Sequence, residues 1–198
     1  METTLAIFAR RSIRKFAATP IPHDAIREIL LSATQAPSAK NRQPWRFVVV
    51  ENAAKTEMLQ AMKKGFQREA QSPQLPDSAH YLTGAQHTLS IMAQAPVTVF
   101  VINPLSTMDA FPNSWESRFY DAANIQSVGA CIQNMLLKAT DMGYGSLWIC
   151  DIFFAYEDIC RWLGTQEQVV AAISFGVPAE SPHARPRKDL DDLIQWRD

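Results

Sequence analysis

The feature that most constrains the fold is a long apolar helix predicted over residues 121–142. Its apolar side chains do not keep to one stripe but recur on nearly every face of the helix. They are Ala122, Ala123, Ile125, Val128, Ala130, Ile132, Met135, Leu136, Leu137 and Ala139. A helix of this kind is covered on most sides, so we expect it at the centre of a domain or at a subunit interface.

Short apolar runs, rich in β-branched residues, predict buried strands over residues 47–50, 97–102 and 169–175. Residues 146–150 are also strand-like, which gives four predicted strands. Helices are predicted over residues 3–10 with Thr3 and Thr4 as the caps, over a segment capped by Asp24 and ended by Pro37, and over residues 53–64 and 155–163. Strands interleaved with helices predict a sheet with helical layers. Because the 198 residues show no repeat or linker, we expect a single domain, 1–198.

Two segments lack this periodicity. Residues 65–85 mix glycine, glutamine, serine, proline and aspartate, so they are predicted to be irregular and are the candidate for a mobile cover. Residues 179–198 are predicted to form an extended C-terminal arm, because prolines recur near its start. Its hydrophobic end, with Leu190, Leu193 and Trp196, needs a surface to lie against, either its own or that of a partner subunit.

Charge and cysteine usage exclude several classes of protein. Nineteen basic and twenty acidic residues leave a net charge of −1, so no overall field attracts nucleic acid or anionic lipid. The three cysteines lack Cys-x-x-Cys spacing, which favours a reducing compartment over a disulfide scaffold. No apolar run is long enough to span a bilayer, and the first residues are too polar for a signal peptide. We expect a cytoplasmic protein that binds neither nucleic acid nor membrane.

Arginine is concentrated after the first predicted helix, in the run Arg10-Arg11-Ser12-Ile13-Arg14. Arginine binds phosphate through paired donors, and the chain has neither of the common glycine-rich phosphate loops. The run is therefore a candidate anion site. The alternative is a solvated basic turn.

A second candidate is the polar loop 36–45, with the sequence Ala-Pro-Ser-Ala-Lys-Asn-Arg-Gln-Pro-Trp. Its two prolines restrict the backbone, and Ser38, Asn41 and Gln43 can each donate and accept hydrogen bonds. Such a loop can bind the edge of a planar heterocycle. The alternative is an ordinary connection between a helix and a strand.

Four motifs in order carry a resemblance that each alone would not. They are Arg-Arg-Ser-x-Arg-x-Phe at 10–16, Ala-Pro-Ser-Ala-x-Asn-x-Gln-Pro-Trp-x-Phe at 36–47, Gly-Tyr-Gly-Ser-x-Trp-Ile at 143–149, and Arg-Pro-Arg-Lys at 185–188. Together they resemble the nitroreductase family of flavoproteins. The resemblance covers nearly the whole chain, and residues 65–118 match least, which makes them a variable lid region.

The resemblance implies an α+β fold with a central, mostly antiparallel sheet flanked by helices, in an intertwined homodimer with two flavins at the interface. It also implies FMN as the cofactor. The residues that it assigns to FMN binding are Arg10, Arg11, Ser12, Arg14, Pro37, Ser38, Ala39, Asn41, Ile149, Cys150, Arg185 and Arg187.

These residues have different roles in the family. Arg10, Ser12, Arg185 and Arg187 would hold the phosphate, and Arg14 would lie nearer the pyrimidine side of the flavin, where a positive charge stabilises the reduced form. The loop residues Pro37, Ser38, Ala39 and Asn41 would come from the other subunit. Backbone atoms of the stretch 148–151 would lie beside flavin N5, and this chain departs from the family there by having Cys150 and Asp151.

The implied activity is transfer of electrons from NADH or NADPH to a small organic acceptor such as a nitroaromatic or a quinone. Two alternatives stay open: a specialised reaction of the superfamily, reductive dehalogenation or flavin cleavage, and a non-catalytic flavin carrier or sensor. The flavin provides the reactivity, so we expect no catalytic side chain and a dispensable Cys150 thiol. The four scattered histidines lack metal-ligand spacing, so we expect no metal site.

Overall fold

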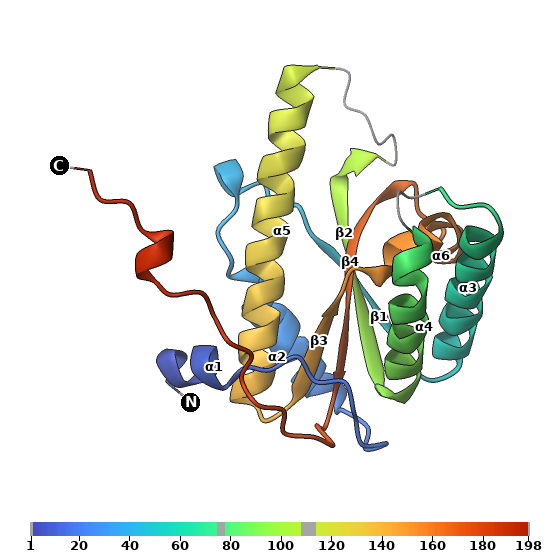
Figure 1. The fold of residues 1–198 in the computed structure, drawn as a ribbon, viewed down its shortest axis with the longest axis horizontal. Helices are drawn as coiled ribbons and strands as arrows, with labels where there is room; N and C mark the ends of the chain where they lie inside the picture. Colours follow the sequence, from blue (N-terminus) through green and yellow to red (C-terminus); the bar gives the residue numbers. More distant parts are fainter. Residues whose placement is uncertain (1, 75–77, 108–113, 198) are drawn as a thin grey trace.

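The computed structural model describes residues 2–74, 78–107 and 114–197, and its central element is a sheet of four antiparallel strands (Figure 1). The strands are β1 (Arg46–Val50), β2 (Val97–Thr107), β3 (Gly145–Ile149) and β4 (Glu167–Gly176). They lie in the order β1-β2-β4-β3, so the two central strands each pair on both sides. The four predicted strands and the expected α+β fold with an antiparallel sheet are confirmed.

Helices cover both faces of the sheet (Figure 1). One face carries α2 (His23–Thr34) and α5 (Trp115–Asp141), and the other carries α3 (Asn52–Gln71), α4 (Ser78–Gln94) and α6 (Tyr156–Leu163). The alternation of side chains along β2 shows why both faces are apolar. Val99 and Val101 pack in the core under α2 and α5, whereas Phe100 and Ile102 pack in the core under the other three helices.

The long apolar helix predicted over 121–142 is α5, which begins earlier, at Trp115. Ser114 caps it through a reciprocal pair of hydrogen bonds with Ser117, which the sequence reading did not identify. Its buried side chains include Val128, Ile132 and Met135, which pack against the sheet face shared with α2. Ile125 of the same helix is 37% exposed, so α5 covers one face of the sheet and is not enclosed on all sides; its place at a subunit interface stays a prediction.

The prediction of an irregular segment over 65–85 is wrong. Helix α3 continues to Gln71 and α4 begins at Ser78, and the described residues 72–74 follow α3. The physical reason is burial: Met58, Met62 and Phe66 recur every four residues and are fully or nearly fully buried, so their packing outweighs the local glycine and polar residues. The segment 65–118, predicted as a variable lid, also contains the central strand β2.

The predicted capping residues of the first two helices are also corrected. The short α1 (Thr3–Ala9) has Glu2 at its N-cap position rather than Thr3 or Thr4, and α2 has Pro22 there rather than Asp24. Asp24 instead lies in the first turn of α2, where a carboxylate is stabilised by the helix dipole.

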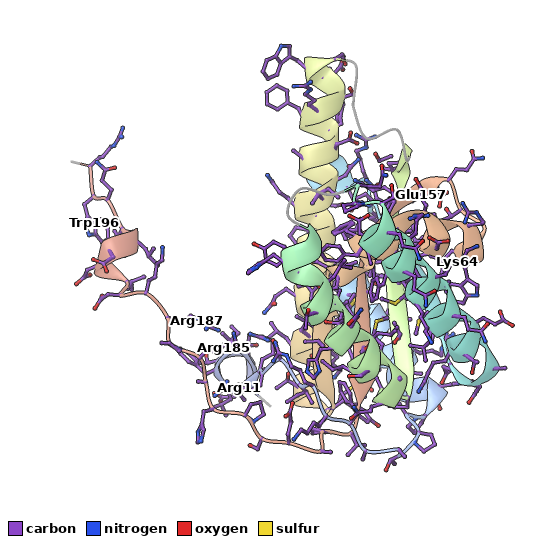
Figure 2. All side chains as sticks on the ribbon, turned by 45° about the vertical axis from the view of Figure 1, so that its right-hand side comes forward. Arg11, Lys64, Glu157, Arg185, Arg187 and Trp196 are labelled. Atoms are coloured by element: carbon purple, nitrogen blue, oxygen red, sulfur yellow. The ribbon has the colours of Figure 1, made fainter. Side chains whose placement is uncertain are left out.

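The segment after α1 is held between β3 and the segment after β4. Ser12 forms a bridge with Ser146 and Phe16 forms one with Pro178. The amide of Ala17 donates to the carbonyl of Val177 at 2.9 Å. Past this pairing, the arm extends away from the helices and contains a short 3-10 turn, η3 (Asp191–Leu193) (Figures 1 and 2). Among the described residues, no helix has the length and apolar character needed to cross a bilayer.

Candidate functional site

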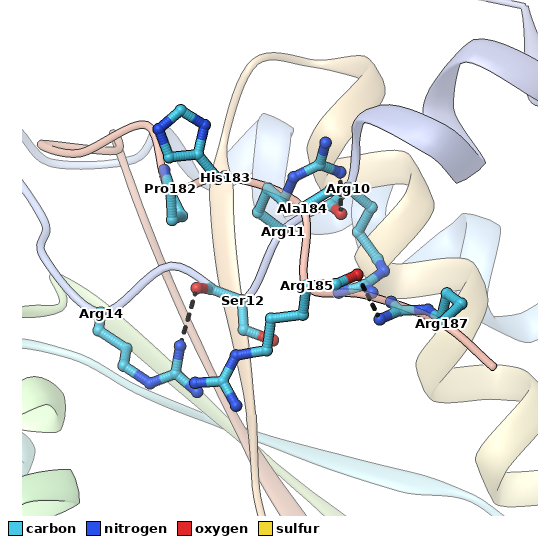
Figure 3. Close-up of a pocket in the computed structure, with 9 residues that line it drawn as sticks. All are labelled: Arg10, Arg11, Ser12, Arg14, Pro182, His183, Ala184, Arg185 and Arg187. Carbon is cyan, nitrogen blue, oxygen red and sulfur yellow. Dashed lines mark hydrogen bonds between the residues drawn. The ribbon is translucent and has the colours of Figure 1, made fainter.

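A strongly basic pocket lies where the segment after α1 meets the C-terminal arm (Figure 3). It has a volume of about 90 Å³ and is lined by Arg10, Arg11, Ser12, Arg14, Pro182, His183, Ala184, Arg185 and Arg187. Five of these nine residues are arginines and none is acidic. Like charges converge in this way where an anion is to be bound, and the volume fits a phosphate-sized group rather than a whole ligand.

The arginines of this pocket keep most of their donors available. Arg11 Nη1 donates to the carbonyls of Phe8 and Arg10 at 2.6 and 2.9 Å, and Arg187 Nη1 donates to the carbonyl of Arg185 at 3.2 Å. Each guanidinium has five N–H donors, so one or two bonds to carbonyls leave the rest free. None of the five pairs with a carboxylate of the described residues, so an external anion would be their charge partner.

Glu180 fixes the backbone on which the pocket is built. Its Oε1 accepts hydrogen bonds from the amides of Arg14, at 2.5 Å, and of Lys15, at 3.2 Å. The amide of Ala179 donates in turn to the carbonyl of Lys15 at 2.9 Å. This link across about 165 residues of sequence sets the position of Arg14 relative to the arm.

A second, larger pocket shares Arg14 with the first. It has a volume of about 340 Å³ and is lined by Arg14, Thr88, Leu147, Trp148, Ile149, Cys150 and Asp151. The end of β3 and the start of the 3-10 turn η2 (Asp151–Ala155) provide most of its wall. The predicted residues Ile149 and Cys150 therefore lie beside the predicted phosphate residues, with Arg14 between them.

Thr88 is a residue of this pocket that the sequence reading missed. It lies on α4, and its hydroxyl donates to the carboxylate of Asp151, which is 63 positions away in sequence. No local pattern marks Thr88, because one threonine on a helix is common and its partner is known only from the packing of α4 against η2. The contact orients the Asp151 carboxylate on the wall of the larger pocket.

Cys150 is exposed, and its environment disfavours the thiolate form. Partial burial of the sulfur raises the pKa of Cys150, and the neighbouring carboxylate of Asp151 raises that pKa further. A raised pKa reduces the fraction of reactive thiolate at neutral pH. That the thiol has no catalytic role stays a prediction.

The loop residues Pro37, Ser38, Ala39 and Asn41 line neither of these two pockets. They lie beside α5, where the amide of Ala39 donates to Ser127 Oγ at 3.3 Å, and they include the 3-10 turn η1 (Ala39–Asn41). A single subunit therefore does not bring them together with the arginines.

The backbone of this loop is unusual. Lys40, Asn41 and Gln43 have φ angles of 53, 52 and 49°, in the left-handed region that residues other than glycine rarely adopt. Each such residue costs on the order of 1 kcal/mol, and costs of this kind are concentrated at functional sites. Lys40 and Arg42 also lie over the ring of Tyr120, at 5.5 and 4.8 Å from its centroid.

The described part of the chain contains no cluster of three or more histidine, cysteine, aspartate or glutamate side chains arranged to hold a metal ion. The polar groups that line the two pockets are five guanidinium groups, the hydroxyls of Ser12 and Thr88, the His183 imidazole, the Trp148 indole, the Cys150 thiol and the Asp151 carboxylate.

Known proteins with the same architecture were found by sequence and by structure. The NADH dehydrogenase of Thermus thermophilus is 40% identical and is matched over 100% of this chain and 97% of its own. A solved BluB-like flavoprotein of Clostridium difficile 630 is 24% identical, with a TM-score of 0.84 over 100% of both chains. The solved FMN- and NADPH-dependent nitroreductase NfnB of Sphigopyxis sp. strain HMH is 18% identical, with a TM-score of 0.80 over 100% of both.

The two solved structures share the fold with this chain. The sequence model of the nitroreductase family matches residues 7–177, which include the basic run, the polar loop and both central strands of the sheet. The match spans the first three of the four motifs, whereas residues 185–188 lie outside it. The chain belongs to the nitroreductase family.

Proposed function

We propose that this protein is an FMN-dependent oxidoreductase that passes electrons from NADH or NADPH to a small organic acceptor such as a nitroaromatic or a quinone. The observation that carries the proposal is the pair of pockets joined by Arg14. The smaller pocket has the charge and volume for one terminal phosphate. The larger one has room for part of a planar ring system, and Arg14 is placed to contact both groups.

The donor set fits FMN better than FAD. Five arginines suit a single phosphate monoester, which they bind through paired N–H donors, and no adenine-binding glycine fingerprint occurs in the sequence. When bound, FMN would supply the electron-transfer chemistry. The side chains described here would bind the phosphate, orient the ring and place the positive charge of Arg14 beside it.

The electron donor is proposed from the relatives. The Thermus thermophilus protein is named for NADH and the Sphigopyxis protein for NADPH, so a reduced nicotinamide is the common class of donor. We propose that the natural acceptor is small and organic, because it would share the larger pocket, of about 340 Å³, with the flavin ring, and the lining of that pocket offers few polar side chains.

The complete site is proposed to need a second copy of the chain in a cytoplasmic homodimer. The loop with Pro37, Ser38, Ala39 and Asn41 lies outside both pockets, so it can contribute to a site only through another subunit. Exposed apolar side chains on α1 and the arm support this assembly: Phe8 is 75% exposed and Trp196 is 84% exposed.

The test begins with the cofactor. The purified protein should be yellow and release FMN, and Arg10→Glu should lose it, because charge reversal in the phosphate pocket repels the anion. Arg27→Glu, the same reversal at an exposed position of α2 outside both pockets, is the control. Release of stoichiometric FAD, or an Arg10→Glu protein that keeps FMN, would overturn the cofactor assignment.

The second half of the test is turnover. Oxidation of NADH and NADPH is followed at steady state with a nitroaromatic and with a quinone. Acceptor-dependent oxidation supports the enzyme, whereas a flavin-loaded protein that oxidises neither nicotinamide would be a carrier or sensor. Loss of the flavin chromophore itself during turnover would instead indicate flavin cleavage.

A further inference from the structure

The larger pocket carries a negative charge that the proposed function does not use. Asp151 lies on its wall, at the start of η2 and two residues after the end of β3. Arg14 is the other charged residue of the pocket lining. No lysine, arginine or histidine of the described residues forms an ion pair with Asp151.

One hydrogen bond fixes the backbone around Asp151 and a second one fixes its carboxylate. The backbone at this point is fixed by the turn, where the amide of Phe153 donates to the carbonyl of Cys150 at 3.0 Å. The side chain is fixed by the hydroxyl of Thr88, which reaches it from α4. The Thr88 hydroxyl also lies 3.2 Å from the carbonyl of Gly84, but a hydrogen bond to a carboxylate is the stronger of the two.

The positive charge of Arg14 does not cancel this carboxylate. Arg14 Nη1 donates to the carbonyl of Ser12 at 3.2 Å, and Figure 3 shows its side chain turned toward Ser12 and Arg185 at the phosphate pocket. A bound phosphate and the flavin ring would take up the charge of the arginines. The charge that an acceptor meets in the remaining space is then that of Asp151.

We propose that Asp151, positioned by Thr88, makes the acceptor site select neutral or cationic acceptors and reject carboxylated or sulfonated ones. This inference rests on the proposed function, since it concerns the acceptor of the same site. Asp151 acts by electrostatic repulsion of an anion within a few ångströms, and Thr88 acts through Asp151 as a positioning residue.

The experiment compares 4-nitrobenzamide with 4-nitrobenzoate as acceptors of the FMN-loaded protein. The two differ in charge and little in size, and their intrinsic difference in reactivity cancels when variants are compared with the wild type. Asp151→Asn should lower the ratio of kcat/KM for the amide to that for the carboxylate about tenfold, which corresponds to about 1.4 kcal/mol. Asp24→Asn removes a carboxylate at an exposed position of α2 outside both pockets, so this control should leave the ratio unchanged.

The role of Thr88 is tested by a matched pair of substitutions. Thr88→Val has nearly the same shape but no hydroxyl, so the carboxylate can turn toward solvent and the ratio should fall about threefold. Thr88→Ser keeps the hydroxyl and should keep the wild-type ratio. A Thr88→Val protein with the wild-type ratio would overturn the positioning role.

Binding without turnover provides an independent readout. Benzoate and benzamide are titrated into the oxidised protein while the flavin absorbance is followed. Asp151→Asn should tighten benzoate binding about tenfold and benzamide binding less than twofold. If the protein turns over but the ratio and the benzoate affinity do not change in Asp151→Asn, the inference is wrong and the proposed function stands. If the wild type neither binds FMN nor oxidises a nicotinamide, both fall.

Discussion

Glu180 is the side chain that joins the two walls of the phosphate pocket, because one of its carboxylate oxygens accepts from the amides of Arg14 and Lys15. The main-chain hydrogen bonds between the segment after α1 and its neighbours use other amides, such as that of Ala17, so Glu180 is the acceptor for both Arg14 and Lys15. Hydrogen bonds from main-chain amides to a carboxylate are charge-assisted and are stronger than neutral ones.

We therefore predict that Glu180→Ala weakens FMN binding about tenfold and lowers the free energy of unfolding by about 1 to 2 kcal/mol. The reason is that Arg14 loses its fixed position relative to the arm. Fluorescence titration of the apoprotein with FMN measures the first effect and urea unfolding the second. Glu180→Gln keeps an acceptor oxygen and should lie between the wild type and Glu180→Ala. An unchanged FMN affinity in Glu180→Ala would show that the position of Arg14 does not depend on Glu180.

The Cys150 thiol is predicted to be dispensable. Cys150→Ala should keep FMN and lose less than about tenfold in rate, a barrier change of about 1.4 kcal/mol, because any residue other than proline supplies the same main-chain amide. Stopped-flow absorbance should follow flavin reduction and reoxidation separately. A loss of about a hundredfold in either half-reaction, with FMN bound, would indicate a catalytic thiol.

The pH dependence of the Cys150 thiol follows from the same environment. Since its pKa is raised above that of a free cysteine, the thiolate fraction is lower at every pH below that pKa and rises only as the pH approaches it. Alkylation by iodoacetamide should therefore be slower than for free cysteine at pH 8 and should accelerate above pH 9. Cys131 and Cys160 are buried, so the reaction reports Cys150.

For single residues, the sequence predicted the arginines of the smaller pocket but not Thr88 in the larger one. Arg10, Arg14, Arg185 and Arg187 stand in motifs whose spacing can be read directly, and the structure places all four around one pocket. FMN binding by these residues stays a prediction. Thr88 could not be predicted, because its importance depends on a contact between α4 and η2 that leaves no periodic pattern in the sequence.

At the scale of the elements, α3 and η2 approach closely because α3 has a glycine, Gly65, at the point of contact. A Cβ atom at Gly65 would lie 2.4 Å from the Cα and Cβ atoms of Ala155, so the absence of a side chain sets the distance between the two elements. Gly84 on α4 is different, because a Cβ atom there would meet nothing within 4 Å.

These two glycines make a matched pair. Gly65→Ala should lower the free energy of unfolding by about 1 to 3 kcal/mol, because α3 must move away from η2. Gly84→Ala should raise it by about 0.5 to 1 kcal/mol through helix propensity alone. Thermal unfolding measures both, at about 2 to 4 °C per kcal/mol for a chain of this length. A neutral Gly65→Ala would mean that α3 and η2 can separate at little cost.

The elements also show where sequence patterns stop being informative. The positions of the strands were predicted well, since runs such as 97–102 consist mostly of β-branched and apolar residues, although β2 continues to Thr107. The end of α3 was not, because Gly65 and the polar residues after it weaken the local helix signal. Burial of Phe66 and the contact of Gly65 with Ala155 keep the helix intact, and both are tertiary effects.

At the scale of the whole molecule, the apolar end of the C-terminal arm is not covered by the rest of the same chain. Leu190 and Leu193 are exposed, and Trp196 stands well away from the helices (Figure 2). The pocket arginines Arg185 and Arg187 lie nearer the body of the protein, so the two functions of the arm can be separated by where it is cut.

Removal of residues 189–198 should weaken the homodimer while leaving the phosphate pocket arginines in place. Removal of residues 179–198 should also abolish FMN binding, because Glu180, Arg185 and Arg187 are lost. Sedimentation velocity at micromolar concentration measures the first effect, and the flavin content of the purified protein measures the second. A wild-type monomer with full flavin occupancy would refute the shared site.

The pairing of residues 10–14 with residues 182–187 also determines when the pocket can first exist. Ribosomes add about 5 to 20 residues per second, so the second wall is made on the order of ten seconds after the first. During that interval the nascent chain contains segments of both core clusters, but the phosphate pocket lacks the wall formed by residues 182–187. The pocket arginines take no part in either core cluster. Flavin capture is therefore expected only after residues 182–187 have been made, when all four strands of the sheet have already been synthesised.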